Sequence, residues 1–489
     1  MVSENQTIEI DAPSLPQPWV VSTELKNSLV ITAALLVGAI IWKMPPAGAM
    51  DTTGMHFLAT MVVAITLWVL DVFDEYVVGL MLLLVWVVCG VASTKIALAG
   101  FSENSWFFTI GALGMAAAIG HTTLLQRFSF RLLRWIPIRC QKVYTLLLLS
   151  AGVLSGPLLP TGKARAAVAV PISQSISQAS GFEPRSNGAA IISLSAFVGF
   201  SQMSFMFLTG GDQCLIGWNF LPPEIKAEFG WLSWFVVALP AAAFISLFMF
   251  FAVHFLLPLS RAEKERLDTQ SMQAPVNGLG PISRHEWVTV CTLIMTIGGW
   301  LTKSVHGINE AWVALAALLV FLLTGVLDKQ RFKNQVDWSL ILFFGVLNSM
   351  AIVAENAKAD AWLMSLGAPL LARFAHQPLI FLLIICLLVS GIRFVLRKTP
   401  AAALFAVTVM PLSNMSGIHP GVLIVTGIMA GECFLLTYQD GPYQIAYGGT
   451  GGKAFSHAQA RRVLAAKYIA TLLGVAVSVP YWKYLGFIR

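Results

Sequence analysis

The sequence predicts an all-α polytopic membrane protein with about eleven transmembrane helices in two inverted repeats, each containing a re-entrant hairpin and a broken helix. Of its 489 residues, 57% are hydrophobic and only 11% are charged, whereas soluble domains carry about 25% charged residues. Two apolar stretches, residues 158–171 and 394–411, carry basic residues in their interior. Each is followed by an apolar run that is interrupted by the pattern LTxxD, at 208–212 and 436–440. The same elements in the same order indicate an internal duplication.

Apolar runs define the individual elements, because a helix that crosses about 30 Å of hydrocarbon needs roughly 20 apolar residues, and fewer when other helices shield it. The hairpins are expected at 143–179 and 381–410, closed by Pro171 and Pro411. Two further segments, 127–139 and 359–376, are expected to lie in the membrane interface. The predicted spans are 27–42, 56–70, 76–91, 106–119, 189–216, 231–257, 285–301, 311–327, 338–353, 422–447 and 463–481.

The distribution of lysine and arginine predicts the orientation. Basic loops at 127–142, 261–284, 329–333 and 453–467 face the cytoplasm under the positive-inside rule. The amino terminus is then cytoplasmic and the carboxyl terminus outside, in the inner membrane of a bacterium. Residues 1–26 lack the features of a cleavable signal, so the first span is retained. The first hairpin enters from the cytoplasm and the second from outside, as in inverted-repeat transporters.

Charged residues at the hairpin tips indicate a transport function. A charge at bilayer depth costs about 2.5–3.5 kcal/mol on insertion scales, so such residues usually face a cavity and serve a function. Lys163 and Arg165 lie at the first tip, and Arg397 and Lys398 lie at the second. Charged hairpins in both halves of the chain therefore point to a transporter.

Three stretches resemble the divalent anion/sodium symporter family, the INDY-like transporters. They are DWSLILFFGVLNSMAIVAENAKADAWL, the two hairpins, and the carboxyl-terminal DGPYQIAYGGTGG with VPYWKYLGF, in which residues 440–448, Tyr481 and Trp482 follow the family's outline. The resemblance covers nearly the whole chain and is stronger from about Gly100 onward. It implies a homodimer, with a scaffold domain and a transport domain that moves like an elevator. It also implies a di- or tricarboxylate, or sulfate, as substrate.

This resemblance divides the chain into seven parts. A cytoplasmic tail, 1–26, precedes the scaffold helices of the first repeat, 27–120. Residues 121–220 form the first interfacial helix, hairpin and broken helix of the transport domain. Scaffold helices with a cytoplasmic connection follow at 221–337, and the scaffold helix of the second repeat at 338–357. Residues 358–448 repeat the transport elements, and 449–489 form a loop and the last span.

The hairpin tips depart from the family. Its tips normally carry Ser-Asn-Thr, which supplies sodium ligands and hydroxyl groups for the substrate. The corresponding positions here are Thr161, Gly162 and Lys163 in the first hairpin and residues 401–403, all alanine, in the second. Both asparagines are absent, and glycine and alanine offer only backbone carbonyls to a hard cation. We therefore do not expect conventional sodium coupling, and no other cofactor is indicated.

Our central hypothesis is that fixed cations replace mobile ones, with Lys163 and Lys398 attracting the substrate. Arg165 and Arg397 are either bidentate clamps for an anion or members of structural ion pairs. The aspartates of the two interruptions are expected to pair with the tip cations, although a helix-capping role remains open. The candidate substrate-binding residues are Thr161, Gly162, Lys163, Arg165, Asp212, Gln213, Arg397, Lys398, Thr399, Tyr438, Gln439 and Asp440. Candidates for proton coupling are Asp212, Glu432 and Asp440.

The preferred function is sodium-independent exchange or facilitated transport of di- or polyanionic organic acids such as dicarboxylates or citrate. A sodium- or proton-coupled symporter of carboxylate, sulfonate or sulfate is one alternative, and an anion channel is another. No nucleophile–base pair, HExxH motif or other metal-ligand spacing indicates an enzyme or a metal site. The basic residues form no long block, so nucleic acid is not an expected partner. The expected partners are a small anion, the lipid bilayer and a second copy of the chain.

Overall fold

The structure, a computed structural model, describes most of the chain. The described ranges are 23–46, 50–70, 72–120, 141–157, 161–269, 281–359, 377–396, 398–409, 416–434 and 439–488, with the single residues 122, 124, 127, 159, 362 and 374. Arg397, Pro411 and Tyr438 lie outside them, as do most residues of the two predicted interfacial segments.

The described residues form helices and their connections. The first repeat contains α1 (Thr23–Lys43), α2 (Thr52–Val69), α3 (Glu75–Val88), α4 (Thr94–Ala97), η1 (Ala99–Ser102), α5 (Asn104–Gly120), α7 (Gln141–Leu154), α8 (Gly162–Ala179), α9 (Asn187–Ser201), η2 (Ser204–Met206), η3 (Leu208–Gly210) and α10 (Asp212–Asn219). The connection to the second repeat contains α11 (Pro223–Glu228), α12 (Trp231–Leu256) and α13 (Arg261–Thr269). The second repeat contains α14 (Arg284–Leu301), α15 (Lys303–His306), α16 (Glu310–Leu323), α17 (Lys329–Gln335), α18 (Trp338–Asn356), α20 (Pro378–Val395), α21 (Lys398–Val409), α23 (Pro420–Gly431), α24 (Gly441–Gly449) and α25 (His457–Tyr484).

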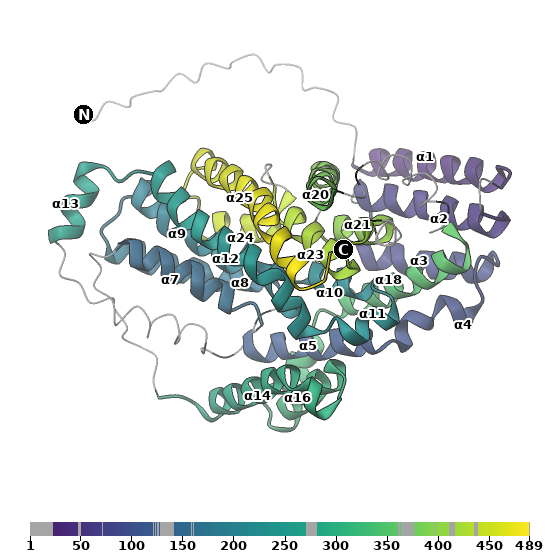
Figure 1. Cartoon of the computed structure of the whole chain (residues 1–489), viewed down its shortest axis with the longest axis horizontal. Helices are drawn as coiled ribbons and strands as arrows, with labels where there is room; N and C mark the ends of the chain where they lie inside the picture. The colour runs from purple at the N-terminus through teal and green to yellow at the C-terminus, as the bar shows by residue number, and fades with distance from the viewer. Residues whose placement is uncertain are drawn as a thin grey trace, which may run out of the picture.

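Each predicted span coincides with a helix or with a broken helix. Within the described ranges, α12, α18, α25 and the segment Asn187–Met206 are long and apolar enough to cross a membrane alone. Eight shorter apolar helices accompany them, as expected where neighbouring helices shield one another. In Figure 1, α7, α8, α9, α12 and α13 lie toward one end of the molecule, and α1 to α4 lie toward the other.

Both hairpins are present, and their outgoing helices begin at the charged residues. Helix α8 begins at Gly162, so Lys163 lies in its first turn, and α21 begins at Lys398. The expectation that Pro171 closes the first hairpin is wrong, because Pro171 lies inside α8, which continues to Ala179. An internal proline is tolerated in a membrane helix where neighbouring groups satisfy the freed backbone carbonyl.

The first hairpin packs against the broken helix through two glycines. Helices α7 and α8 both contact α9, and α7 crosses α9 at Gly152 and Gly199. A Cβ atom added at Gly152 would lie 2.2 Å from the Gly199 carbonyl carbon and 2.3 Å from the Phe200 amide nitrogen. This close approach sets the position of the tip relative to the break.

Replacing Gly152 with alanine should therefore separate α7 from α9 and lower the stability of the fold. Overpacking typically costs 1–3 kcal/mol, which would appear as a lower melting temperature of the detergent-solubilised protein in size-exclusion melting curves. Gly298→Ala on α14 is the matched control, because an added Cβ there meets no described heavy atom within 4 Å. Equal melting temperatures for the two variants would contradict the proposed tight crossing.

Candidate functional site

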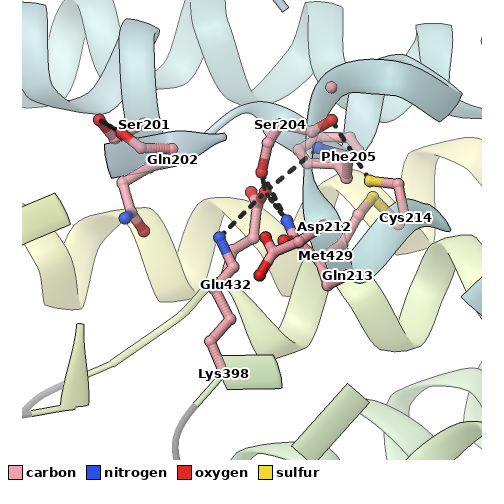
Figure 2. Close-up of polar contacts among 12 residues, drawn as sticks. Ser201, Gln202, Ser204, Phe205, Asp212, Gln213, Cys214, Lys398, Met429 and Glu432 are labelled. Carbon is pink, nitrogen blue, oxygen red and sulfur yellow. Dashed lines mark hydrogen bonds and ion pairs between the residues drawn. The ribbon is translucent and has the colours of Figure 1, made fainter. Parts of the chain in front are cut away.

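A buried carboxylate, Glu432, joins the two repeats. It directly follows α23 and is fully buried. Its Oε1 accepts hydrogen bonds from the Ser204 hydroxyl, from the Phe205 amide at 3.1 Å and from Gln213 Nε2 at 3.1 Å. Gln213 Nε2 also donates to Ser204 Oγ at 2.6 Å. Figure 2 shows these side chains converging on the carboxylate at the interruption between α9 and α10. The second repeat thus supplies the acceptor for the first repeat's broken helix.

Two lysines face the same carboxylate. Lys398 Nζ lies 3.9 Å from Glu432 Oε1, and Lys467 Nζ lies 3.7 Å from Oε2. The Lys398 side chain is 13% exposed, whereas those of Glu432 and Lys467 are fully buried. Because a buried ion loses several kcal/mol of hydration, each member depends on the others for compensation. Lys398, Glu432 and Lys467 form what we call the buried ionic triad.

Lys163 lies on a separate cavity of about 270 Å³. The hairpin side of this cavity carries Lys163, Asp212 and Thr399, and Thr399 Oγ1 donates to Asp212 Oδ2 at 2.8 Å. Residues at the beginnings of α3 and α18 complete the lining, including the carboxyl groups of Asp74, Glu75 and Asp337. The cavity is somewhat smaller than pockets for drug-sized ligands, which suits a small organic acid.

The prediction that Asp212 and Asp440 pair with the hairpin-tip cations is wrong for those cations that the structure describes. Among the residues that the structure describes, no ion pair joins Asp212 or Asp440 to Lys163, Arg165 or Lys398. Asp440 instead caps α24, where its Oδ1 accepts from the Tyr443 amide at 2.9 Å. The capping alternative therefore holds at Asp440, and Glu432 is the acidic partner of the tip lysine Lys398.

Several other candidates have structural contacts. Thr161 is the N-cap of α8 and accepts from the Ala164 amide at 3.4 Å. The Gly162 carbonyl accepts from Ser201 Oγ at 3.4 Å, and Gln439 Nε2 donates to the Arg393 carbonyl at 2.6 Å. Arg165 is buried and donates to backbone carbonyls, away from the lining of the cavity. Arg397 and Tyr438 lie outside the described residues.

Sequence reasoning missed Lys467, Ser204 and Arg393. Lys467 lies where the predicted cytoplasmic loop 453–467 overlaps the predicted span 463–481, and the structure places it on α25, which begins at His457. Arg393 stands inside the apolar run of α20. A basic residue within an apolar helix is the signal that could have identified both.

Comparison with known proteins fits this architecture. Residues 25–488 match the family described as the sodium:sulfate symporter transmembrane region. The chain belongs to this family. Its members are membrane transporters, so this chain is an integral membrane transporter of small anions and not an enzyme.

Individual members of the sodium:sulfate symporter family are distant in sequence. The chain is 23% identical to the inner membrane protein YbhI of Escherichia coli over 86% of this chain and 88% of that protein. It is 28% identical to chloroplastic dicarboxylate transporter 2 of Spinacia oleracea over 43% of this chain and 38% of that protein. Its fold is similar to the crystal structure of the YdaH transporter of Alcanivorax borkumensis, with a TM-score of 0.56, 16% identity, and coverage of 94% and 98% of the two chains.

The buried ionic triad predicts unequal effects of removing its members. Glu432→Gln leaves two ammonium groups without their carboxylate and should cost about 3–5 kcal/mol of stability. Lys467→Met should cost less, because Lys398 still compensates Glu432. The double variant Glu432→Gln/Lys467→Met should recover part of the loss caused by Glu432→Gln, measured as melting temperature in detergent. Additive effects of the two substitutions would contradict the coupling of these groups.

Proposed function

We propose that this protein exchanges small di- or polyanionic organic acids across a bacterial cytoplasmic membrane without sodium coupling. The observation that supports this proposal is the excess of fixed positive charge at the hairpins and breaks. Among the described residues of the hairpins and breaks, four are basic and three are acidic, a formal excess of one positive charge, and Lys467 of α25 adds a second beside Glu432. The basic residues are Lys163, Arg165, Arg393 and Lys398, and the acidic ones are Asp212, Glu432 and Asp440. A bound dianion would neutralise this excess.

Lys163 and Thr399 would contact the anion directly. Both line the cavity, and each lies in the first turn of its helix, α8 or α21. The positive end of the helix dipole at both amino termini adds to the potential of the ammonium group. The ammonium group suits one end of a short dicarboxylate, and the Thr399 hydroxyl would donate to the other end after turning away from Asp212 Oδ2.

The charge excess also favours exchange over net transport. Moving one elementary charge across a membrane is worth about 2.3 kcal/mol per 100 mV. A site with two uncompensated positive charges would reorient less readily when empty than when a dianion neutralises it. After it releases one anion, the binding site would therefore need to bind a second anion on that side of the membrane before it reorients.

The cavity walls suit an elevator mechanism. Asp74, Glu75 and Asp337, at the scaffold helices, repel an anion, whereas Lys163 on the hairpin attracts it. The substrate would accordingly be held by the hairpin side and travel with it. The name of the spinach relative as a dicarboxylate transporter supports the substrate class, and the name of YbhI as an inner membrane protein supports the localisation. We include a homodimer and a cytoplasmic amino terminus in the proposal.

Exchange can be measured directly in proteoliposomes preloaded with unlabelled anion. We expect uptake of labelled succinate or citrate to require internal anion and to be the same with and without sodium. The same uptake is measured with labelled sulfate, and with a pH gradient across the proteoliposome membrane. Strict sodium dependence would refute sodium-independent exchange, uptake driven by the pH gradient would favour proton coupling, and ohmic anion currents would favour a channel.

Lys163→Ala should weaken substrate binding without affecting the dimer or the buried ionic triad. Loss of a hydrogen bond to a charged group costs about 1.5–3 kcal/mol, equivalent to a tenfold to hundredfold higher KM for exchange. Lys163→Arg should retain much of the affinity, because it keeps the charge. Lys95→Ala on α4 is the control for a lysine remote from the cavity. An unchanged KM in Lys163→Ala would exclude Lys163 as a substrate ligand.

A further inference from the structure

We infer that Arg165 and Arg393 are built-in cations that hold each hairpin tip to its broken helix and make a bound alkali cation unnecessary there. Both are positioning residues, since they act on the substrate through the hairpins. The inference deepens the proposed function and rests on its sodium independence. The observation that supports it is the set of hydrogen bonds that the two guanidinium groups donate to backbone carbonyls.

Arg165 bridges the tip and the break of the first repeat. Its Nη1 donates to the Leu159 carbonyl at the hairpin tip, at 2.8 Å, and to the Gly210 carbonyl in the interruption before α10. Its Nε donates to the Phe200 carbonyl near the end of α9. The side chain is only 1% exposed. One guanidinium group therefore connects three segments of the first repeat.

Arg393 makes the corresponding connection in the second repeat. Its Nη1 donates to the Leu396 carbonyl at the tip, and its Nη2 donates to the Gln439 carbonyl in the interruption before α24, both at 3.0 Å. Gln439 returns a hydrogen bond from Nε2 to the Arg393 carbonyl at 2.6 Å. Arg393 is also 1% exposed.

The two arginines occupy different positions in the hairpins, but each donates to one carbonyl at the tip and to another in the break. Arg165 follows its tip, on the outgoing helix α8, whereas Arg393 precedes its tip, on the incoming helix α20. They are therefore not equivalent residues of the internal duplication. The shared arrangement in space, reached from different positions, indicates a common requirement for a cation between tip and break in each repeat.

Sodium, which the family's description names, does not fit these positions. A hard cation needs several oxygen ligands, and the four acceptor carbonyls described between tip and break, those of Leu159, Gly210, Leu396 and Gln439, already bind guanidinium groups. A sodium ion placed on the same oxygens would also lie beside a permanent positive charge. Within the described residues, no cluster of three acidic, histidine or cysteine side chains offers a replacement. The arginines thus fix the tips, and with them Lys163 and Thr399, without a mobile cation.

The test is chemical rescue of arginine-to-alanine variants of the full-length protein in proteoliposomes. Arg393 borders a cavity of about 80 Å³ that is also lined by Ser390 and Tyr468, so free guanidinium can occupy the space of the deleted side chain. We expect Arg393→Ala and Arg165→Ala to lower succinate exchange at least tenfold. Guanidinium chloride at about 20 mM, far below denaturing concentrations, should restore part of the exchange by Arg393→Ala, and sodium chloride at the same concentration should restore less.

Arg266→Ala is the matched control, because Arg266 pairs with Glu183 near the surface. It should retain exchange and show no response to guanidinium. Arg393→Lys and Arg165→Lys keep the charge but cannot bridge two carbonyls in a planar arrangement, and they should also lose exchange while melting near the wild-type temperature. Wild-type exchange in the lysine variants, or equal effects of the two salts on Arg393→Ala, would overturn the inference.

The same experiment separates the inference from the proposed function. A wild-type protein that requires sodium would refute sodium-independent exchange. The rescue of Arg393→Ala by guanidinium can still be scored at saturating sodium. Loss of rescue with sodium-independent wild-type exchange would refute only the role of the arginine.

Discussion

The structure depends on one constraint, which is that backbone groups freed at a helix break in a membrane must find partners inside the protein. Two long helices are interrupted here, between α9 and α10 and between α23 and α24. In the first interruption, the carboxylate of Glu432 accepts from the Phe205 amide, and Arg165 donates to the Gly210 carbonyl. In the second, Asp440 accepts from the Tyr443 amide, and Arg393 donates to the Gln439 carbonyl. At each break, a carboxylate thus accepts from a backbone amide and an arginine donates to a backbone carbonyl.

These partners also unite the two halves of the chain. Glu432 belongs to the second repeat, but its hydrogen bonds reach Ser204, Phe205 and Gln213 of the first. Gln202 of the first repeat in turn donates to Asp440 of the second at 3.4 Å. A displacement of one break would therefore disturb the other. The hairpins and broken helices are consequently expected to move as a unit, which is what an elevator mechanism requires.

The apolar pattern was sufficient to predict the helices but not their polar contacts. The spans and hairpins follow from apolar runs of suitable length, and the boundaries of α12 and α18 differ from prediction by only a few residues at either end. Lys467 shows why the site was harder to predict. It closes the basic segment 453–467, which is expected to face the cytoplasm and which overlaps the predicted span 463–481, whereas α25 begins at His457 and buries Lys467 against Glu432. No local pattern identifies a partner that lies on a different helix, and the Arg165 bonds to carbonyls involve no side-chain partner at all.

The difference between fixed and mobile cations determines what such a transporter can do. A bound sodium ion can leave with the substrate, so the emptied site returns without its charge. A lysine or arginine cannot leave, and the charge of the site then changes only when an anion binds or dissociates. The buried ionic triad fixes part of that charge permanently, because removal of Glu432 would leave two ammonium groups without their carboxylate. In the proposed mechanism the anion would therefore serve as the counter-ion of the site on both crossings, and exchange would follow from the replacement of sodium ligands by basic side chains.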